Sequence, residues 1–291
     1  MRPILVTGGT GQVATALGAA AGTVVVGRPE FDFDRPETLA AVFAASRPRL
    51  VVNAAAWTGV DAAEAEPDAA MRANHDGPAA LARLCADAGI PIVHISTDYV
   101  FDGDKGAPYV EADPPSPTGV YGRTKLAGEA AVLAACPQVI VLRTSWVYAA
   151  TGKNFVRTML GAARKTDRLR VVADQRGCPT SAADLAAAIL AIAARLEDGW
   201  RPGFGGVFHA AGAGETTWHG LAVAVFEQAA RHGQRKPEVT PIATADWPTP
   251  ARRPADSRLD CTRLGLVFDI RLPDWRPSLD RTIDDIFGSG N

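Results

Sequence analysis

The feature that most constrains the fold lies near the start of the chain, where an apolar run meets a glycine-rich turn and then a helical pattern. Ile4-Leu5-Val6 is typical of a buried strand, residues 7–14 include Gly8 and Gly11, and an apolar helix pattern follows to about residue 20. A strand, a glycine turn and a helix form the first unit of a dinucleotide-binding domain, because glycine lets the backbone approach a pyrophosphate and the helix start offers free N–H groups. The pattern predicts a dinucleotide site, against the alternative of an ordinary tight turn.

Further buried-strand patterns follow at residues 23–26, 50–52, 92–95, 139–142, 169–172 and 207–209. Ala-rich helical stretches separate them; one spans 61–85, with breaks near 66–67 and 76–78, and a loop covers 105–118. This alternation predicts an α/β fold with a Rossmann-type doubly wound parallel sheet. We assign residues 1–146, with about 168–174 and 183–211, to the dinucleotide-binding domain. About 147–167, 175–182 and 212–291 form a smaller C-terminal substrate-binding lobe, because the βαβ rhythm fades there.

The composition is that of an ordinary globular protein, with 47% hydrophobic and 21% charged residues among 291. The net charge of -2 gives no basic surface for a nucleic acid or an anionic membrane, so neither is expected as a partner. No apolar run approaches the length of a membrane span, and the chain starts in a strand pattern instead of a signal peptide, which predicts a cytoplasmic protein. The 4 cysteines form no C-x-x-C pair, so we expect reduced thiols and no zinc site.

Cofactor preference depends on the end of the second strand. An acidic residue there would hold the ribose 2′-hydroxyl of NAD, whereas this chain has Gly27-Arg28. Arg28 suits a 2′-phosphate and so favours NADPH, although NADH is possible and a solvent-facing arginine is the alternative. Asp32-Phe33 follows at the usual depth for contacting adenine. After the third strand, the small residues of the segment 53–58 leave room for a cofactor, or else pack the strand end tightly.

Tyr121 and Lys125 are the candidates for proton transfer. Residues four apart on a helix lie on one face, and a nearby ammonium lowers the pKa of a tyrosine, which starts near 10. Such a tyrosine can exchange a proton near neutral pH. Thr97 precedes it at the end of the fourth strand, where its hydroxyl can donate to a substrate carbonyl. Trp146, after the fifth strand, either offers a flat surface to a sugar or fills the core.

Together these segments resemble the extended short-chain dehydrogenase/reductase superfamily and, within it, the dTDP-4-dehydrorhamnose reductase family. The early matches are Thr-Gly-Gly-Thr-Gly-Gln-Val from Thr7, Val-Asn-Ala-Ala-Ala from Val52, Val-Asp-Ala-Ala-Glu from Val60, Ser-Thr-Asp-Tyr-Val-Phe-Asp-Gly from Ser96 and Tyr-Gly-Arg-Thr-Lys-Leu-Ala-Gly-Glu from Tyr121. Later matches, at residues 143–148, 154–160, 174–180, 216–219 and 253–260, point to the reductase.

The resemblance implies three sets of site residues. The catalytic set is Thr97, Tyr121 and Lys125. The cofactor set is Gly8, Gly11, Gln12, Val13, Arg28, Asp32, Phe33, Ala55, Ala56, Thr58, Tyr121 and Lys125. The sugar-nucleotide set is Val60, Thr97, Asp98, Tyr121, Trp146 and Arg258. Arg258 would contact the diphosphate, with Arg252 and Arg253 as substitutes, or instead pair structurally with Asp256 or Asp260.

The implied reaction is NAD(P)H-dependent reduction of the 4-keto group of a dTDP-6-deoxy-hexulose. A 4-epimerase would use the same three catalytic residues, and a silent regulatory subunit like the β subunit of methionine adenosyltransferase would share the fold. A 4,6-dehydratase would need an Asp-Glu pair after the threonine, whereas this chain has Asp98-Tyr99. Some family members dimerise around a magnesium ion held by glutamates that we do not locate here, so magnesium stays open, as does the choice between a monomer and a homodimer.

Overall fold

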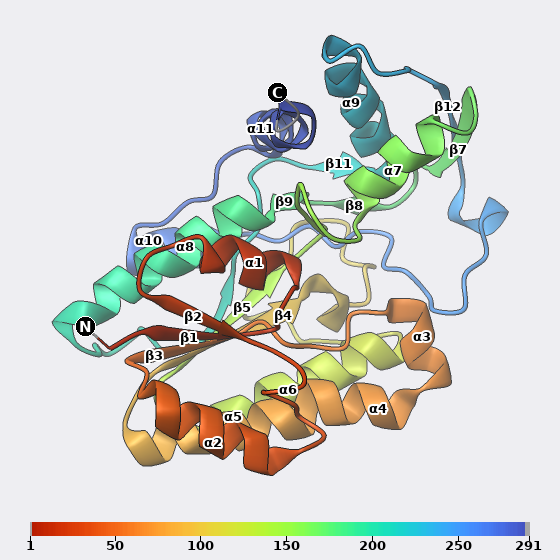
Figure 1. Cartoon of the computed structure of the whole chain (residues 1–291). Helices are drawn as coiled ribbons and strands as arrows, with labels where there is room; N and C mark the ends of the chain where they lie inside the picture. Colours follow the sequence, from red (N-terminus) through yellow and green to blue (C-terminus); the bar gives the residue numbers. More distant parts are fainter. Residues whose placement is uncertain (1, 289–291) are drawn as a thin grey trace.

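The computed structural model describes residues 2–288 and centres on a sheet of six parallel strands (Figure 1). The first half of the chain contains β1 (Ile4–Thr7), α1 (Gln12–Gly18), β2 (Thr23–Val26), α2 (Pro36–Ser46), β3 (Leu50–Asn53), α3 (Val60–Ala65), α4 (Pro67–Met71), a π-helical turn (Arg72–Asp76), α5 (Gly77–Ala88), β4 (Ile92–Thr97), α6 (Val120–Ala135) and β5 (Val139–Thr144). The second half contains β6 (Val147–Tyr148), α7 (Phe155–Ala163), β7 (Arg168–Val172), β8 (Arg176–Gly177), β9 (Thr180–Ser181), α8 (Ala182–Arg195), β10 (Gly206–His209), β11 (Thr216–Thr217), α9 (Trp218–Arg231), β12 (Glu238–Ile242), α10 (Thr262–Phe268) and α11 (Trp275–Gly288). Between residues 2 and 288, no helix has both the length and the apolar character needed to cross a membrane.

The strand order is β10-β5-β4-β3-β1-β2, so the chain winds outward in both directions from β1. The expected strands at 23–26, 50–52, 92–95, 139–142 and 207–209 are confirmed as members of this sheet. Because all of these strands are parallel, their carboxyl ends meet at one edge, and the switch between β1 and β3 opens a crevice there. The predicted Rossmann-type doubly wound fold is therefore confirmed.

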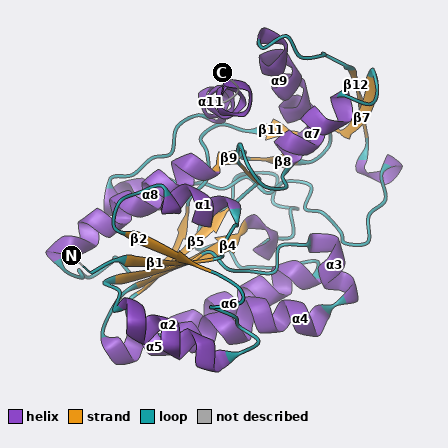
Figure 2. Cartoon of the chain, viewed as in Figure 1, coloured by secondary structure: helices purple, strands orange, loops and turns teal. Residues whose placement is uncertain are grey.

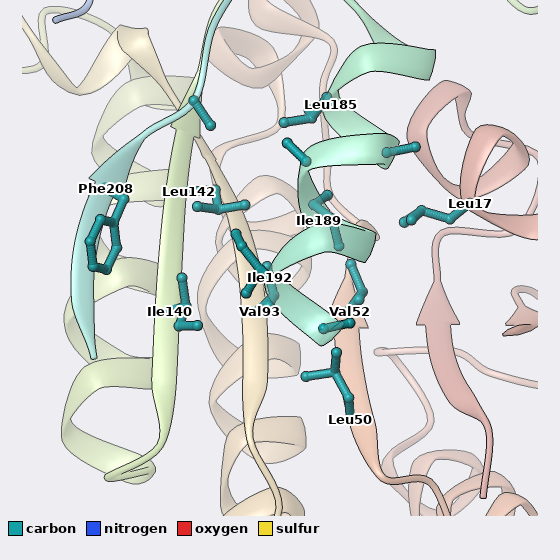
Figure 3. Packing of buried hydrophobic residues seen from close by; sticks show 14 of the residues in the cluster. Leu17, Leu50, Val52, Val93, Ile140, Leu142, Leu185, Ile189, Ile192 and Phe208 are labelled. Atoms are coloured by element: carbon teal, nitrogen blue, oxygen red, sulfur yellow. The ribbon is translucent and has the colours of Figure 1, made fainter. Parts of the chain in front are cut away.

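Helices cover both faces of the sheet (Figure 2). On one face, α1 and α8 share a core with alternate strand residues, and on the other α2, α5 and α6 pack against the intervening ones. Figure 3 shows Leu185, Ile189 and Ile192 of α8 directed at Val93 and Leu142. Their spacing of four and three residues is that of one helix stripe. Strands buried on both sides explain why β1, β3 and β5 are nearly continuous runs of Val, Ile and Leu.

A smaller lobe lies over the carboxyl edge of the sheet. It contains the two-stranded pairs β6–β9, β7–β12 and β8–β11 together with α7, α9 and α11. Its core joins distant segments, since Tyr148 and Trp275 are both buried in it and the Tyr148 hydroxyl donates to the Trp275 carbonyl at 3.2 Å. The lobe therefore depends on the last helix of the described chain.

The predicted domain boundaries differ from the strand pairing at one place. Residues 168–174 were assigned to the dinucleotide-binding domain, but β7 pairs in parallel with β12 along its whole length. Leu169 and Val171 of β7 belong to the lobe core. We therefore group β7 with the lobe, while the rest of the two-domain division stays a prediction.

The helical stretch after β3 was expected to break twice. The first break is confirmed, because α3 ends before Glu66 and α4 begins at Pro67. At the second site the chain stays helical by passing through the π-helical turn into α5. That turn presents the Asn74 side chain, which accepts from the Trp57 backbone N–H at 2.8 Å and donates to its carbonyl at 3.2 Å. Gly77 is needed because a Cβ there would lie 2.1 Å from the ring of Phe33.

Candidate active site

The glycine turn between β1 and α1 is packed too closely for side chains. Gly8 has φ 113°, and a Cβ on it would lie 2.8 Å from the carbonyl oxygen of Ala54. A Cβ on Gly11 would lie 3.0 Å from the carbonyl oxygen of Gly8. L-residues with side chains rarely adopt such a positive φ, so glycine is required at Gly8. The result is a floor of bare backbone at the start of α1, which fits the pyrophosphate of a dinucleotide.

A cleft of about 1020 Å³ runs along the carboxyl ends of the strands. It extends from the loop after β2 to the start of α6 and the segment after β5. All but one of the predicted site residues line it: Gly8, Gly11, Gln12, Val13, Arg28, Asp32, Phe33, Ala55, Ala56, Thr58, Val60, Thr97, Asp98, Tyr121, Lys125 and Trp146. The exception is Arg258. The fold thus brings the predicted cofactor and sugar residues into one cleft, while their individual roles stay predictions.

Thr97 and Tyr121 meet at the reacting end of this cleft. Thr97 is the last residue of β4, and Tyr121 lies in the first turn of α6. The helix approaches the turn after β4 closely because residue 122 is glycine; a Cβ there would lie 2.1 Å from the carbonyl oxygen of Tyr99. The Thr97 hydroxyl is hydrogen-bonded to Tyr121 and donates to the Asp98 carboxylate at 3.1 Å. Two hydroxyl groups therefore face the same point.

The acidity of Tyr121 differs from the expectation. Burial raises its pKa to about 12, the hydrogen bond with Thr97 acts to lower it, and the charge of Asp98 raises it further. The Lys125 ammonium donates to the Ile95 carbonyl at 2.6 Å. The prediction that Lys125 lowers the tyrosine pKa is therefore wrong for this structure, because the ammonium is directed at a strand carbonyl and burial dominates. At neutral pH, Tyr121 is a protonated acid.

Lys125 is supported by a buried ion pair one turn further along α6. Burial lowers the pKa of Lys125 to about 8, and the charge of Glu129 opposes this by raising it. The Glu129 carboxylate accepts from Arg143 at 2.9 and 2.7 Å and from the Ser96 hydroxyl at 2.5 Å. These four side chains belong to residues that are at most 3% exposed. Lys125 therefore lies next to a buried, hydrogen-bonded ion pair of Glu129 and Arg143.

Asp98 is the only carboxylate deep at this end of the cleft among the described residues that line it. Burial raises its pKa to about 6, while hydrogen bonds from Ser257 and Thr97 act to lower it. Ser257 comes from the late segment before α10, so the C-terminal part of the chain reaches the base of the cleft. Asp98 is thus available to accept a hydrogen bond from a substrate hydroxyl.

Two tryptophans, Trp146 and Trp218, line the cleft. Trp146 follows β5 with φ 48°, and Trp218 begins α9; their rings stack with centroids 3.5 Å apart and planes within 7°. Gly177 makes room, because a Cβ there would lie 2.4 Å from the Trp146 ring. Trp146 therefore both lines the cleft and packs against a ring of the lobe, which combines the two alternatives considered for it.

The other end of the cleft carries the groups expected to contact adenosine. Arg28 is exposed there, and no hydrogen bond or ion pair between residues 2 and 288 occupies its side chain. Phe33 packs against Gly77, and the Asp32 carboxylate lies 3.7 Å from the Arg35 guanidinium. Arg28 is therefore free to pair with a 2′-phosphate.

Comparison with known proteins assigns the family. The family profile described as "RmlD substrate binding domain" matches residues 1–287. The chain belongs to this family. A dTDP-4-dehydrorhamnose reductase from Sinorhizobium fredii is 47% identical over 284 residues, which cover 96% of each protein. A crystal structure of a dTDP-4-dehydrorhamnose reductase from Clostridium acetobutylicum superposes with a TM-score of 0.89 at 36% identity, covering 98% of this chain and 99% of the other. The enzyme of that name from Bacillus anthracis, in complex with NADP, also gives a TM-score of 0.89, at 31% identity and the same coverage.

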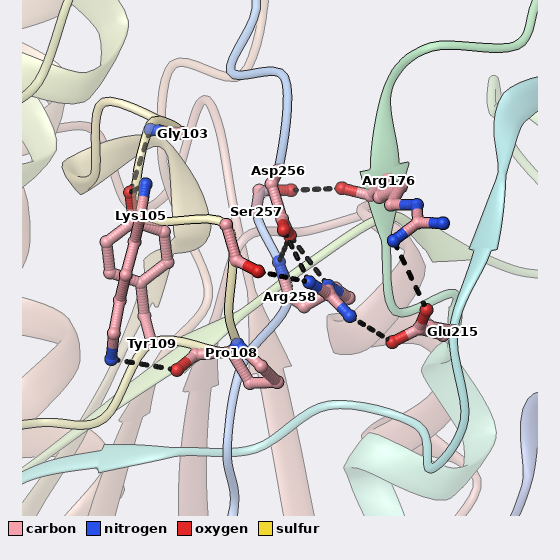
Figure 4. A network of polar contacts seen from close by, with 10 residues as sticks. Gly103, Lys105, Pro108, Tyr109, Arg176, Glu215, Asp256, Ser257 and Arg258 are labelled. Carbon is pink, nitrogen blue, oxygen red and sulfur yellow. Dashed lines mark hydrogen bonds and ion pairs between the residues drawn. The ribbon is translucent and has the colours of Figure 1, made fainter.

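In this member of the RmlD family, Arg258 forms ion pairs with two carboxylates (Figure 4). Its guanidinium contacts Asp256 at 2.6 Å and Glu215 at 2.5 Å, and its side chain is largely buried. The adjacent carboxylates raise its pKa above the ordinary value. The predicted alternative, a structural ion pair with Asp256, is the arrangement present, and it argues against a diphosphate contact at Arg258.

Three residues without a predicted role lie in or behind the cleft of this RmlD family member. Trp218 and Asn154 line it, and Glu129 lies behind Lys125. Asn154 begins α7 as its N-cap and donates to the Gln12 side chain at 2.9 Å, which ties the lobe to the glycine turn. An asparagine before an apolar helical run predicts an N-cap from the sequence. The contact of Asn154 with Gln12, 142 positions earlier, cannot be predicted in this way.

Metal binding stays open. Among residues 2–288, no three His, Cys, Asp or Glu side chains are grouped so that they could hold a metal ion.

Proposed function

We propose that this protein is a dTDP-4-dehydrorhamnose reductase, which reduces the 4-keto group of dTDP-4-dehydro-L-rhamnose with NADPH to give dTDP-L-rhamnose. The observation that carries the proposal is the single cleft that joins a glycine turn to Thr97, Tyr121 and Lys125. Relatives of this name that match nearly the whole chain support it, since activity is read from the site and not from the fold alone.

The cofactor would lie along the cleft from Arg28 to Tyr121. The bare backbone at Gly8 and Gly11 fits the pyrophosphate, and Phe33 with Asp32 bounds the adenosine end. Unpaired Arg28 supports NADPH over NADH, as does the NADP found in the Bacillus anthracis relative. A bidentate guanidinium contact recognises phosphate groups well.

The side chains divide the reaction between them. Bound NADPH supplies the hydride that reduces the C4 carbon of the sugar. Tyr121 holds the proton that the C4 oxygen receives, so the carbonyl becomes a hydroxyl. The Thr97 hydroxyl holds the same oxygen by a hydrogen bond, which favours the developing charge. Lys125, one helical turn from Tyr121, offers its ammonium to the cofactor ribose.

The protonation states fit this direction of proton transfer. With a pKa of about 12, Tyr121 is protonated before the reaction, as a general acid must be. Lys125, with a pKa of about 8, is mostly charged at neutral pH. Asp98 accepts a sugar hydroxyl and stacked Trp146 faces the ring, which fixes the sugar in the cleft.

The alternatives make different demands on the same cleft. A 4,6-dehydratase needs a second carboxylate after the threonine, and the chain has Tyr99 in that position. A 4-epimerase would retain its cofactor through turnover. A silent regulatory subunit would not need the hydrogen bond between Thr97 and Tyr121.

The deciding experiment follows NADPH absorbance with dTDP-4-dehydro-L-rhamnose and identifies the product by NMR. We expect one NADPH to be consumed for each dTDP-L-rhamnose formed. Epimerised product without net NADPH consumption would support the epimerase instead, and no reaction with this or related 4-keto sugars would support the regulatory subunit.

A further inference from the structure

The first turn of α6, which carries Tyr121, has little stabilisation of its own. Its N-cap is Gly119, which has no side chain to cap the helix, and the turn contains no acidic residue. Gly122 also lies in this turn, and glycine is among the residues that favour a helix least. The first N–H groups of any helix lack partners within the helix. Tyr121 therefore lies in a turn that would fray if nothing outside α6 held it.

Both glycines of this turn are required by close neighbours. A Cβ on Gly122 would meet the carbonyl oxygen of Tyr99, as described above. A Cβ on Gly119 would lie 2.9 Å from the Oε1 atom of Glu64. The glycines thus weaken the helix in order to admit a backbone carbonyl at one position and a carboxylate at the other. The second approach brings a charged acceptor to the start of α6.

Glu64 caps α6 from another helix. Its Oε1 atom, near the end of α3, accepts from the Val120 backbone N–H at 2.7 Å. Val120 is the first residue of α6 and directly precedes Tyr121. A carboxylate at this place satisfies a free N–H group and interacts favourably with the positive end of the helix dipole. The turn that lacks a cap of its own therefore receives one from 56 positions earlier in the sequence.

Contacts at the start of α3 hold the helix that carries Glu64. The Trp57 indole donates to the carbonyl of Gly59, the N-cap of α3, at 3.0 Å. One turn before Glu64, the Asp61 carboxylate accepts from the Arg253 guanidinium at 2.8 Å. Glu64 itself is half-buried. Its carboxylate is therefore attached to a fixed helix and not to a free loop.

Other contacts hold α6 beyond its first turn. The Asn74 amide donates to the Thr124 hydroxyl at 3.0 Å, and this hydroxyl donates to the Tyr121 carbonyl at 2.9 Å. A Cβ on Gly128 would lie 1.9 Å from the carbonyl oxygen of Asn74. These contacts act from the Tyr121 carbonyl onward. The N–H group before Tyr121 depends on Glu64.

We propose that Glu64 is a positioning residue for Tyr121. By capping α6 from α3, it keeps the first turn in the place where the Tyr121 hydroxyl meets Thr97, and small displacements of a reacting group cost rate. Among the described residues, Glu64 is not one that lines the cleft, so it acts through the helix. The requirement is for an acceptor at the right distance and not for a charge. This inference rests on the proposed function for the reaction that Tyr121 serves, but the cap can be measured without turnover.

The kinetic test compares three substitutions of Glu64. Glu64→Ala removes the acceptor, Glu64→Asp withdraws it by one methylene, and Glu64→Gln keeps an oxygen at the same distance without the charge. We expect kcat to fall about tenfold in the first two, which corresponds to about 1.4 kcal/mol, and most of the rate to return in Glu64→Gln. The affinity for NADPH should be unchanged in all three. Glu66→Ala, at an exposed acid two positions later, is the matched control and should leave kcat unchanged.

A second test moves the cap to another residue. Gly119→Ser places a hydroxyl acceptor at the N-cap of α6, where serine is strongly preferred. Glu64→Ala removes the carboxylate that would crowd this side chain, so the serine has room. Gly119→Ser should therefore restore kcat to the Glu64→Ala variant. Backbone hydrogen exchange over residues 119–123, followed by mass spectrometry, should be faster in Glu64→Ala and slower again in Glu64→Gln and in the double variant.

The outcomes separate this inference from the proposed function. A wild-type kcat in Glu64→Ala would overturn the inference, even if the wild-type protein reduces dTDP-4-dehydro-L-rhamnose. A loss of NADPH affinity that parallels the loss of kcat would also overturn it, as would the failure of both Glu64→Gln and Gly119→Ser to restore the rate.

A wild-type protein that does not reduce this sugar would reject the proposed function, and hydrogen exchange would then decide the inference. Unchanged exchange over residues 119–123 in Glu64→Ala would overturn the cap. Faster exchange that Glu64→Gln reverses would uphold it.

Discussion

Glu129→Gln tests how the buried ion pair of Glu129 and Arg143 affects Lys125, the lysine proposed to be catalytic. The substitution keeps the size of the side chain but removes its charge, so Arg143 loses its one carboxylate partner among residues 2–288 while remaining 3% exposed. Breaking a buried pair by neutralising one partner costs about 3–5 kcal/mol. For a chain of this size, each kcal/mol lowers the melting temperature by about 2 °C. We therefore expect Tm to fall by about 6–10 °C.

The same change should alter the pH dependence of activity. The charge of Glu129 raises the pKa of Lys125, which burial brings to about 8, so its removal lowers that pKa below 8. If catalysis needs the ammonium, the alkaline limb of kcat against pH moves to lower pH. The pKa of Lys125 also affects the free energy of unfolding. Because this pKa is lower in the folded state than the unfolded value of 10.5, the unfolded state binds more protons between pH 8 and 10.5. Lys125 therefore destabilises the fold most below about pH 8, and this cost declines as the pH rises toward 10.5.

The measurement combines thermal unfolding with kcat determined from pH 6 to pH 10. Glu37→Gln, the same chemical change at an exposed site in α2, is the control and should alter neither quantity. An alkaline limb that coincides with that of the wild type would refute the link between Glu129 and Lys125, even if Tm falls. An unchanged Tm would refute the estimate for the buried pair.

Four substitutions test the other assignments. Tyr121→Phe should lower kcat about 10²- to 10⁴-fold with cofactor affinity nearly unchanged; a variant that keeps more than about a tenth of the rate would exclude Tyr121 as the proton donor. Arg28→Ala should raise the KM for NADPH and spare NADH, because it removes a charged contact worth about 1.5–3 kcal/mol; equal effects on both cofactors in steady-state kinetics would make Arg28 a mere surface residue. Gly122→Ala should lower kcat and Tm together, since its Cβ would lie 2.1 Å from the Tyr99 carbonyl oxygen; wild-type values of both would show that α6 can shift freely. Arg258→Ala should lower Tm by several degrees and leave the KM for the dTDP-sugar nearly unchanged, because it breaks a structural ion pair; a raised KM at constant Tm would instead restore Arg258 as a diphosphate contact.

The sequence predicts the sheet and the contents of the cleft because both depend on local patterns. Runs of Val, Ile and Leu mark strands covered on both faces, and the ends of parallel strands meet at one edge. Gly8 is required by its positive φ and Gly11 by a backbone contact within the same short turn, and one helical turn places Tyr121 beside Lys125. Because these features depend on residues close together in the sequence, they can be predicted from the sequence alone.

Other features depend on contacts between distant segments and are not readable in this way. Trp146 stacks on Trp218, and Arg258 pairs with Glu215, only after the lobe has closed over the sheet. β7 has an ordinary strand pattern that does not say which partner it takes. The acidity of Tyr121 follows from burial, a property of the whole fold, so a rule based on the spacing to Lys125 gave the wrong direction.

The composition of the lobe core has a consequence for synthesis of the chain. The Tyr148 hydroxyl bonds to the Trp275 carbonyl across 127 positions of the sequence. A ribosome adds about 5–20 residues per second, so roughly 6–25 s pass between the emergence of these two residues. During that interval the sheet strands up to β5 are already complete, whereas the apolar sides of α7 and α9 lack α11. The nascent lobe therefore exposes apolar surface to which chaperones can bind, and this exposure ends when α11 packs against α7 and α9.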